Sequence, residues 1–250
     1  MMVRGQPIAL KNGDYLLPIY HEVGNDTENV GAGSTSLFLR YDVRAKKWSE
    51  TGRIGSKKGN IQPAVAALDD EHLVAYCRRG GGYGPGTQGY IIRSESRDGG
   101  KTWSEGRDTQ FPNPNAAVDF LRLRNGHLLL VFNDSMEDRD RLTVAISIDN
   151  DQTWPHRRVI AEGGSRDFAY PYAVQTRDGK IQLIFTSHDR TVINLAQLLW
   201  RRNTKRRHEV RHISAVRPPG PGALATRKPH LFFRNRCKRI HTHPLHCHSP

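Results

Sequence analysis

A short motif that recurs in the first 200 residues constrains the fold more than any other feature of this 250-residue chain. Two segments read S-x-D-x-x-x-T-W, one from Ser96 to Trp103 and one from Ser147 to Trp154. A degraded third copy, which lacks the Thr, ends at Trp48, and the three tryptophans stand 55 and 51 residues apart. A chain that repeats with such a period folds as a series of similar units.

A second landmark, a polar turn followed by an apolar run, recurs with nearly the same period. Its four copies are separated by 58, 55 and 53 residues, measured at Gly13, Glu71, Gly126 and Gly179. Asn-Gly or Asp-Gly followed by aliphatic and aromatic residues is typical of a β-hairpin. Two landmarks with one period therefore predict units of four strands, and four-stranded units in series indicate a β-propeller.

The Ser, Asp, Thr and Trp of the motif have a structural interpretation. In a turn, Ser and Asp side chains accept hydrogen bonds from nearby backbone N–H groups. The Trp that follows can pack between neighbouring sheets, as large apolar residues do between the units of repeat proteins. We therefore expect these residues to build the turns rather than to carry out chemistry.

The net charge of +13 arises almost entirely from the last fifth of the chain. Residues 201–250 hold 13 of the 38 Lys and Arg residues but only one of the 25 acids. We predict a domain boundary near residue 196, with a partial propeller over 1–196 and a basic tail rich in Arg, Pro and His over 197–250. The tail is expected to be disordered or to result from a shifted reading frame, and nucleic-acid binding by its basic cluster is the less favoured alternative.

Several classes of protein are excluded by composition. No stretch approaches the ~20 apolar residues of a membrane span. The N-terminus lacks the apolar core of a signal peptide. Because we expect the native N-terminus to be missing, the bacterial cytoplasm, the periplasm and secretion all stay open as locations. Three cysteines are too few for a disulfide framework, and the His and Cys residues of the tail fit no standard zinc spacing. We expect neither a metal nor another cofactor.

The motif resembles the Asp-box of sialidases (neuraminidases) and sialidase-like propeller enzymes. The segment from Asp98 to Trp103 matches closely, whereas the copy at Asp149 has Asn-Asp-Gln where the family prefers a glycine. The segment that starts at Tyr170 resembles the sialidase stretch Y-S-x-L-x-x-L-x-D-G-x-I. The resemblance covers about residues 3–195 and is strongest to the bacterial predicted-neuraminidase group. It implies an all-β, sialidase-like β-propeller, of which the chain holds about three and a half four-stranded blades out of six or seven.

The resemblance also implies a set of catalytic residues. Aligned on Asp178 and the glycine after it, Tyr170 falls at the family's nucleophile position, where a neutral phenol avoids repulsion from an anionic sugar. The carboxylate that activates it could be Glu22 or Asp119, and the general acid/base could be Asp134. The spacing of these carboxylates does not distinguish their roles.

Substrate-binding residues are expected where strands end at the central funnel. Arg78 and Arg79, with Arg190 as a third, are the candidates for bidentate binding of a substrate carboxylate. The remaining candidates in the substrate-binding set are Tyr172, His21 and His188.

Three functions remain open. The first is an exo-sialidase type of glycoside hydrolase acting on anionic glycans. The second is a polysaccharide lyase or glycosidase acting on uronate-containing glycans, in which His21 or His188 moves protons. The third is a non-catalytic propeller that binds glycans or proteins. The family's R-I-P motif is not found near the chain start, so we expect this chain to be an inactive fragment.

Overall fold

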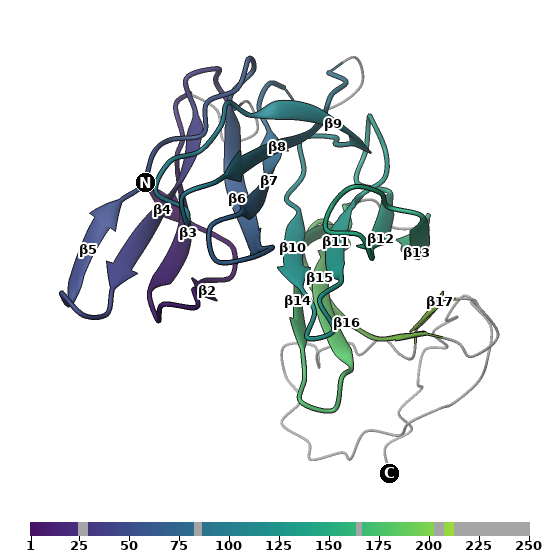
Figure 1. Cartoon of the computed structure of the whole chain (residues 1–250). Coiled ribbons are helices and arrows are strands. Elements are labelled where there is room, and N and C mark those ends of the chain that lie inside the picture. The colour runs from purple at the N-terminus through teal and green to yellow at the C-terminus, as the bar shows by residue number, and fades with distance from the viewer. Residues whose placement is uncertain (25–29, 83–86, 164–166, 203–207, 213–250) are drawn as a thin grey trace, which may run out of the picture. The chain divides into compact units, whose positions relative to one another are not determined.

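The computed structural model describes residues 1–24, 30–82, 87–163, 167–202 and 208–212. In these residues all regular structure is β-strand, arranged in four sheets (Figure 1). No helix in this part of the chain could span a membrane. Most of the predicted tail, residues 213–250, lies outside the described residues.

Each sheet is an antiparallel meander whose strands follow one another in the chain. In the first sheet a split inner strand, β1 and β2, pairs with β3; its elements are β1 Met2–Val3, β2 Ile8–Ala9, β3 Tyr15–His21, β4 Thr35–Asp42 and β5 Lys47–Glu50. The second sheet consists of β6 Asn60–Ala67, β7 Leu73–Arg79, β8 Tyr90–Ser96 and β9 Arg107–Pro112.

The third sheet consists of β10 Asp119–Arg122, β11 Leu128–Asn133, β12 Arg141–Ser147 and β13 His156–Glu162. The fourth consists of β14 Ala169–Gln175, β15 Ile181–Ser187, β16 Val192–Arg202 and β17 His208–His212. These sheets are the blades of a β-propeller, which confirms the predicted fold class. The fourth blade is more complete than the predicted half blade. Every residue of β15 pairs with β16, and β16 continues past residue 196.

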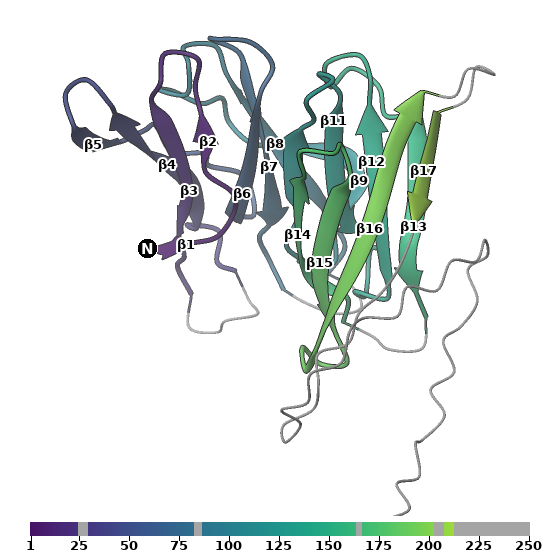
Figure 2. The ribbon, with the colours of Figure 1, turned by 90° about the horizontal axis from the view of Figure 1, so that it is seen from below.

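The blades pack face to face in chain order, and Figure 2 shows the first two beside each other. In β7, Leu73, Ala75 and Cys77 pack toward the first blade, whereas Val74 and Tyr76 pack toward the third. Successive residues of a strand point to opposite faces, so a blade between two others buries both sets. This is why the apolar runs after the hairpin turns are continuous rather than alternating.

The two S-x-D-x-x-x-T-W turns have the predicted hydrogen bonds. Asp98 accepts from the backbone N–H of Thr102 at 2.9 Å and from its hydroxyl at 2.6 Å. Asp149 holds Thr153 in the same way. The Trp that follows each turn reaches the preceding blade; Trp103, for example, stacks on the ring of Phe38 in β4 with centroids 4.6 Å apart.

Asp151 adds an ion pair between blades to the second of these turns. It has a φ of 75°, and its side chain is only 2% exposed. Its carboxylate accepts from the Tyr76 hydroxyl at 2.5 Å, the Arg93 Nε at 2.7 Å and the Trp154 Nε1 at 3.2 Å. Asp151 stands where the motif prefers a glycine, and its contacts join the second and third blades.

We expect Asp151→Asn to lower the free energy of unfolding by about 2 kcal/mol, because hydrogen bonds to charged groups contribute about 1.5–3 kcal/mol. Asparagine tolerates the positive φ, so the change removes mainly the charge. Urea denaturation followed by circular dichroism measures the effect. Asp108→Asn, an exposed position on β9, is the control. Equal stability of both variants would contradict the role given to Asp151.

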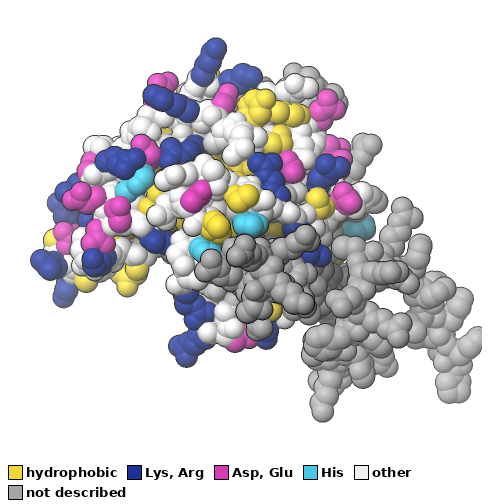
Figure 3. All heavy atoms as spheres, turned by 45° about the vertical axis from the view of Figure 1, so that its right-hand side comes forward, with side chains coloured by type: hydrophobic (Ala, Val, Ile, Leu, Met, Phe, Trp, Pro, Cys, Tyr) yellow, Lys and Arg dark blue, Asp and Glu magenta, His cyan; other side chains and the backbone are white. Residues whose placement is uncertain are grey.

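Surface charges are mixed on the described part of the molecule. Figure 3 shows Lys and Arg interspersed with Asp and Glu over the described part of one face. This agrees with the near balance of acids and bases outside the last fifth of the chain. The net charge of residues 1–200 is therefore close to zero, and only local groups of charged side chains can indicate a ligand.

Candidate active site

The inner strand of three blades is interrupted at one repeated position. In the first blade β1 and β2 are separated by residues 4–7, and in the second and fourth blades the register shifts just before Ala64 and Tyr172. The bulged residues Gln62 and Tyr170 have φ values of 54° and 52°, and each precedes a proline. Positive φ is strained for residues with a side chain, and such strain concentrates at functional sites.

The hairpin turns place these positions in register. Nine residues before the turn landmark stand Arg4, Gln62, Ala117 and Tyr170, one from each blade. Because inner strands of a propeller face its central channel, the repeat brings these four positions together. Arg4 is thus the first-blade counterpart of Tyr170.

Hydrogen bonds link the first three blades near these inner-strand positions. The Gln62 Nε2 lies 3.5 Å from the Tyr20 hydroxyl, and its Oε1 accepts from Arg78 at 3.4 Å. The Arg78 Nε donates to the Asn115 side chain at 2.7 Å. The backbone carbonyl of Asn115 in turn accepts from Arg139 at 3.0 Å. A buried polar layer therefore runs from β3 to the third blade.

The same layer continues into the fourth blade through one carboxylate. Asp167 accepts from the Arg139 Nη1 at 3.1 Å and from the Arg190 Nε at 3.2 Å. Arg139 is 1% exposed, whereas the Arg190 side chain is 42% exposed. One arginine of this pair is therefore structural and the other faces solvent.

Two guanidinium groups lie near the ring of Tyr170. The Arg4 guanidinium carbon is 5.8 Å from the centroid of the Tyr170 ring, and that of Arg190 is 5.5 Å away. Tyr170 is half-buried. Cations that gather beside an accessible side chain attract an anionic ligand to that place. The predicted nucleophile is thus in a positively charged, accessible place.

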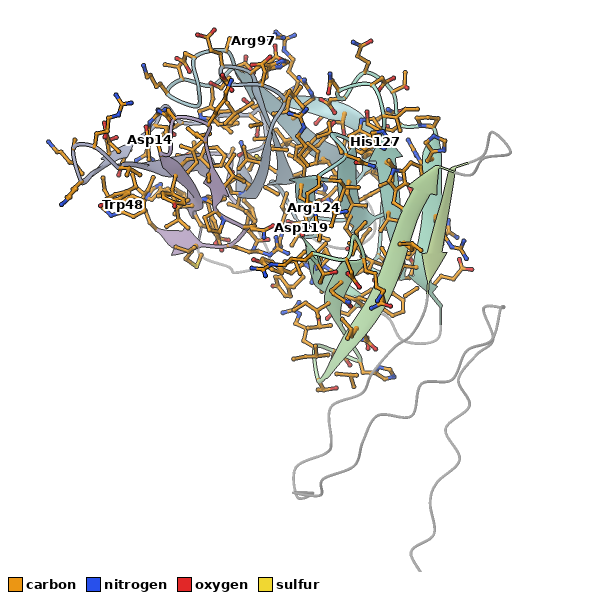
Figure 4. The ribbon with its side chains drawn as sticks, turned by 60° about the horizontal axis from the view of Figure 1, so that its bottom comes forward. Asp14, Trp48, Arg97, Asp119, Arg124 and His127 are labelled. Carbon is orange, nitrogen blue, oxygen red and sulfur yellow. The ribbon has the colours of Figure 1, made fainter. Side chains whose placement is uncertain are left out.

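Asp119 is the buried carboxylate of the site. It is 1% exposed at the start of β10, where its Oδ2 accepts from the Ala173 backbone N–H at 2.6 Å. Burial raises its pKa to about 6, and the nearby positive charge of Arg4 opposes that rise. Burial also raises the pKa of Tyr172, and the Asp119 charge adds to this effect. Figure 4 shows Asp119 among the inner strands.

The structure brings together only part of the predicted site. Tyr170, Tyr172 and Asp119 lie around Arg4, and Arg190 lies beside Tyr170. Arg78 belongs to the polar layer through Gln62 and Asn115. The described contacts that connect this cluster do not pass through Glu22, His21 or Asp134. Arg79 donates to the carbonyls of Asn113, Gly80 and Gly82, and it therefore anchors loops. His188 is exposed, with its Nδ1 2.9 Å from the Ser187 hydroxyl.

Sequence reasoning missed three residues of this cluster and its polar layer: Arg4, Arg139 and Asp167. Arg4 could have been found from its distance to the first hairpin turn, which equals that of Tyr170 to the fourth. Arg139 and Asp167 lie in loops, outside any strand pattern. Within the described residues, no group of three or more His, Cys, Asp or Glu residues is placed to hold a metal ion.

The raised pKa of Asp119 predicts that the stability of the fold depends on pH. Its folded-state pKa of about 6 is above the ordinary value of 3.8, so protonation favours the folded chain. This stabilisation is complete below about pH 4 and is lost as the pH rises through about 6, a change of about 3 kcal/mol. We therefore expect Asp119→Asn to gain stability relative to wild type between about pH 4 and pH 7. Urea denaturation across this range measures the difference in the free energy of unfolding between Asp119→Asn and wild type. A difference that does not change with pH would contradict the prediction.

Comparisons with known proteins agree with the fold. The family model described as "BNR repeat-like domain" matches residues 1–183. A search of curated proteins finds no match.

Among solved structures, the Hadza microbial sialidase Hz136 superimposes with a TM-score of 0.55 at 16% identity, over 73% of this chain and 34% of that one. The intramolecular trans-sialidase from Ruminococcus gnavus gives 0.55 at 17% identity, over 73% and 38%. A protein of unknown function from Dyadobacter fermentans gives 0.56 at 20% identity, over 74% and 49%. The chain thus spans about a third to a half of these proteins, and the likeness is one of fold.

Proposed function

Because this chain belongs to the BNR repeat-like domain family, we propose that it is a glycan-acting propeller whose site takes an anionic sugar, as a sialidase-like glycoside hydrolase of the exo-sialidase type. The observation that carries this proposal is that the guanidinium groups of Arg4 and Arg190 both lie near the ring of Tyr170. A phenol beside two cations suits a nucleophile that must approach a negatively charged sugar.

The charge balance of the site supports an anionic ligand. Four arginines surround the polar layer, whereas two aspartates, Asp119 and Asp167, oppose them; the arginines are Arg4, Arg78, Arg139 and Arg190. The excess of positive charge favours a carboxylate-bearing sugar over a neutral one. Arg190 is the arginine best placed to meet it, because its side chain is partly exposed beside Tyr170.

Asp119 is the carboxylate that we propose for proton transfer. The described contacts connect Asp119, rather than Glu22 or Asp134, to the cluster around Arg4. A carboxylic acid with a pKa of about 6 can both accept and return a proton near neutral pH. In the proposed reaction the Tyr170 oxygen attacks the anomeric carbon and passes its proton to Asp119, which returns it to the leaving oxygen as the glycosidic bond breaks. Water then attacks the anomeric carbon and gives one proton to Asp119, the bond between the sugar and Tyr170 breaks, and Asp119 returns that proton to the Tyr170 oxygen.

Some of the similar solved structures support a sialylated ligand. They include a sialidase and two intramolecular trans-sialidases, from leech and from Ruminococcus gnavus, although an exo-β-1,3-galactanase also superimposes, with a TM-score of 0.51. A uronate-containing glycan carries the same carboxylate, and it is therefore the alternative ligand that the test must separate.

Binding to the 250-residue chain tests the proposal directly. Titrations with N-acetylneuraminate, glucuronate and galactose, followed by NMR, should show binding of one of the two acids and none of galactose. Arg190→Gln should weaken this binding about tenfold, since it removes one charge-assisted contact. Arg97→Gln, at an exposed arginine labelled in Figure 4, is the matched control and should bind as wild type. Binding of galactose as strong as that of the acids would overturn the proposal, and preference for glucuronate would favour the uronate alternative.

A further inference from the structure

One side chain of the first blade reaches across to the third and fourth blades. The Arg4 Nη1 donates to the Val118 carbonyl at 2.8 Å, and its Nη2 donates to the Pro171 carbonyl at 2.7 Å. Arg4 itself lies in the gap between β1 and β2. A planar guanidinium can hold two acceptors at a defined separation, which a lysine cannot do.

The two carbonyls stand next to the residues proposed for the reaction. The Val118 carbonyl belongs to the peptide group that begins Asp119, and Pro171 follows Tyr170 directly. The guanidinium therefore fixes the spacing between the backbone that carries the carboxylate and the backbone that carries the phenol. These two backbones otherwise belong to different blades.

The Arg4 backbone is itself held in place. A Cβ at Gly5 would lie 2.7 Å from the Pro63 carbonyl, so the chain after Arg4 passes directly against the inner strand of the second blade. Gly5 also has a φ of 109°, which a residue with a side chain rarely adopts. Arg4 is thus presented from a backbone without freedom to shift.

We propose that Arg4 is a positioning residue, which ties the peptide groups beside Asp119 and Tyr170 together and so sets the geometry of the proposed catalytic pair. The reaction that it serves rests on the proposed function, whereas its control of the site can be measured without turnover.

The pKa of Asp119 is a readout of Arg4 that is separate from the stability of the fold. The ionisable groups that face Asp119 are Arg4 and Tyr172. Burial raises the Asp119 pKa and the charge of Arg4 lowers it, so loss of this charge must raise it further. A nearby opposite charge typically shifts a carboxyl pKa by about one unit or more.

Arg124 supplies a matched control. It follows β10 in the third blade and donates to the carbonyls of Thr176 and Arg177 in the fourth, so it also bridges two blades through a guanidinium on two main-chain oxygens. Its residue is exposed, and it lies at the hairpin-turn end of the inner strands rather than at Asp119. Arg124 and Asp119 are labelled in Figure 4.

The experiment compares Arg4→Gln, Arg4→Lys, Arg124→Gln and Arg124→Lys in the full chain. The Asp119 pKa is measured by carbon-13 NMR of its carboxyl group, and the affinity for N-acetylneuraminate and glucuronate by titration. We expect Arg4→Gln to raise the Asp119 pKa by about one unit or more and to weaken binding at least tenfold. Arg4→Lys keeps the pKa near wild type but still weakens binding, since it cannot span both carbonyls. The Arg124 variants should change neither quantity.

Each outcome decides the proposal. An unchanged Asp119 pKa in Arg4→Gln, or equal losses of affinity in the Arg4 and Arg124 variants, would overturn it. If wild type binds neither acid, the proposed function fails, and the pKa measurement still decides the role of Arg4. If Arg4→Gln does not fold, Arg4→Lys decides the proposal. Affinity equal to wild type in Arg4→Lys would show that Arg4 does not position the site.

Discussion

Asp167→Asn is expected to lower the free energy of unfolding by about 3 kcal/mol or more, because it removes a carboxylate charge that pairs with the buried Arg139 guanidinium. Asp167 has a φ of 74°, which asparagine tolerates, so the loss reports charge rather than backbone strain. For a domain of this size the melting temperature should fall by about 6–12 °C. Thermal denaturation followed by circular dichroism measures it.

Asp140→Asn is the control for this prediction. Asp140 is exposed in the loop that also carries Arg139, and it should leave the melting temperature within about 1–2 °C of wild type. A small effect of Asp167→Asn would mean that Arg139 is compensated by other groups. Asp167 would then be removed from the connection between the third and fourth blades.

Tyr170→Phe has the largest expected effect on function. The phenylalanine ring keeps the place of the phenol near Arg4 and Arg190 but lacks the attacking oxygen. In any form of the protein that turns over a fluorogenic anionic glycoside, kcat/KM should fall by at least about 100-fold, whereas affinity for the free acid should change little.

Tyr15→Phe is the control, since Tyr15 is an exposed tyrosine at the start of β3, beside the first hairpin turn. It should retain most of the turnover. Wild-type activity of Tyr170→Phe would remove Tyr170 from the mechanism and favour proton transfer by His21 or His188, as in a lyase. The appearance of an unsaturated uronate, detected by its ultraviolet absorbance, would then identify that reaction.

Much of the fold could be predicted because its signals are local. The hairpin turn at Gly126 and the turn at Asp98 depend on residues within a few positions of each other, so their patterns are visible in the sequence. The fourth blade was predicted to be partial because no third S-x-D-x-x-x-T-W turn follows Gly179. Strand β16 forms nevertheless, since pairing with β15 depends on backbone hydrogen bonds and on apolar burial rather than on that turn.

The repeat, the four-stranded unit, the turns and the place of Tyr170 in the repeat could all be predicted from the sequence, because each depends on spacing along the chain. The charged groups that lie near Tyr170 could not be predicted in this way. The Arg4 hydrogen bonds join residues 114 and 167 positions apart. No spacing in the sequence encodes such contacts, because they exist only after the blades have packed and their inner strands have converged.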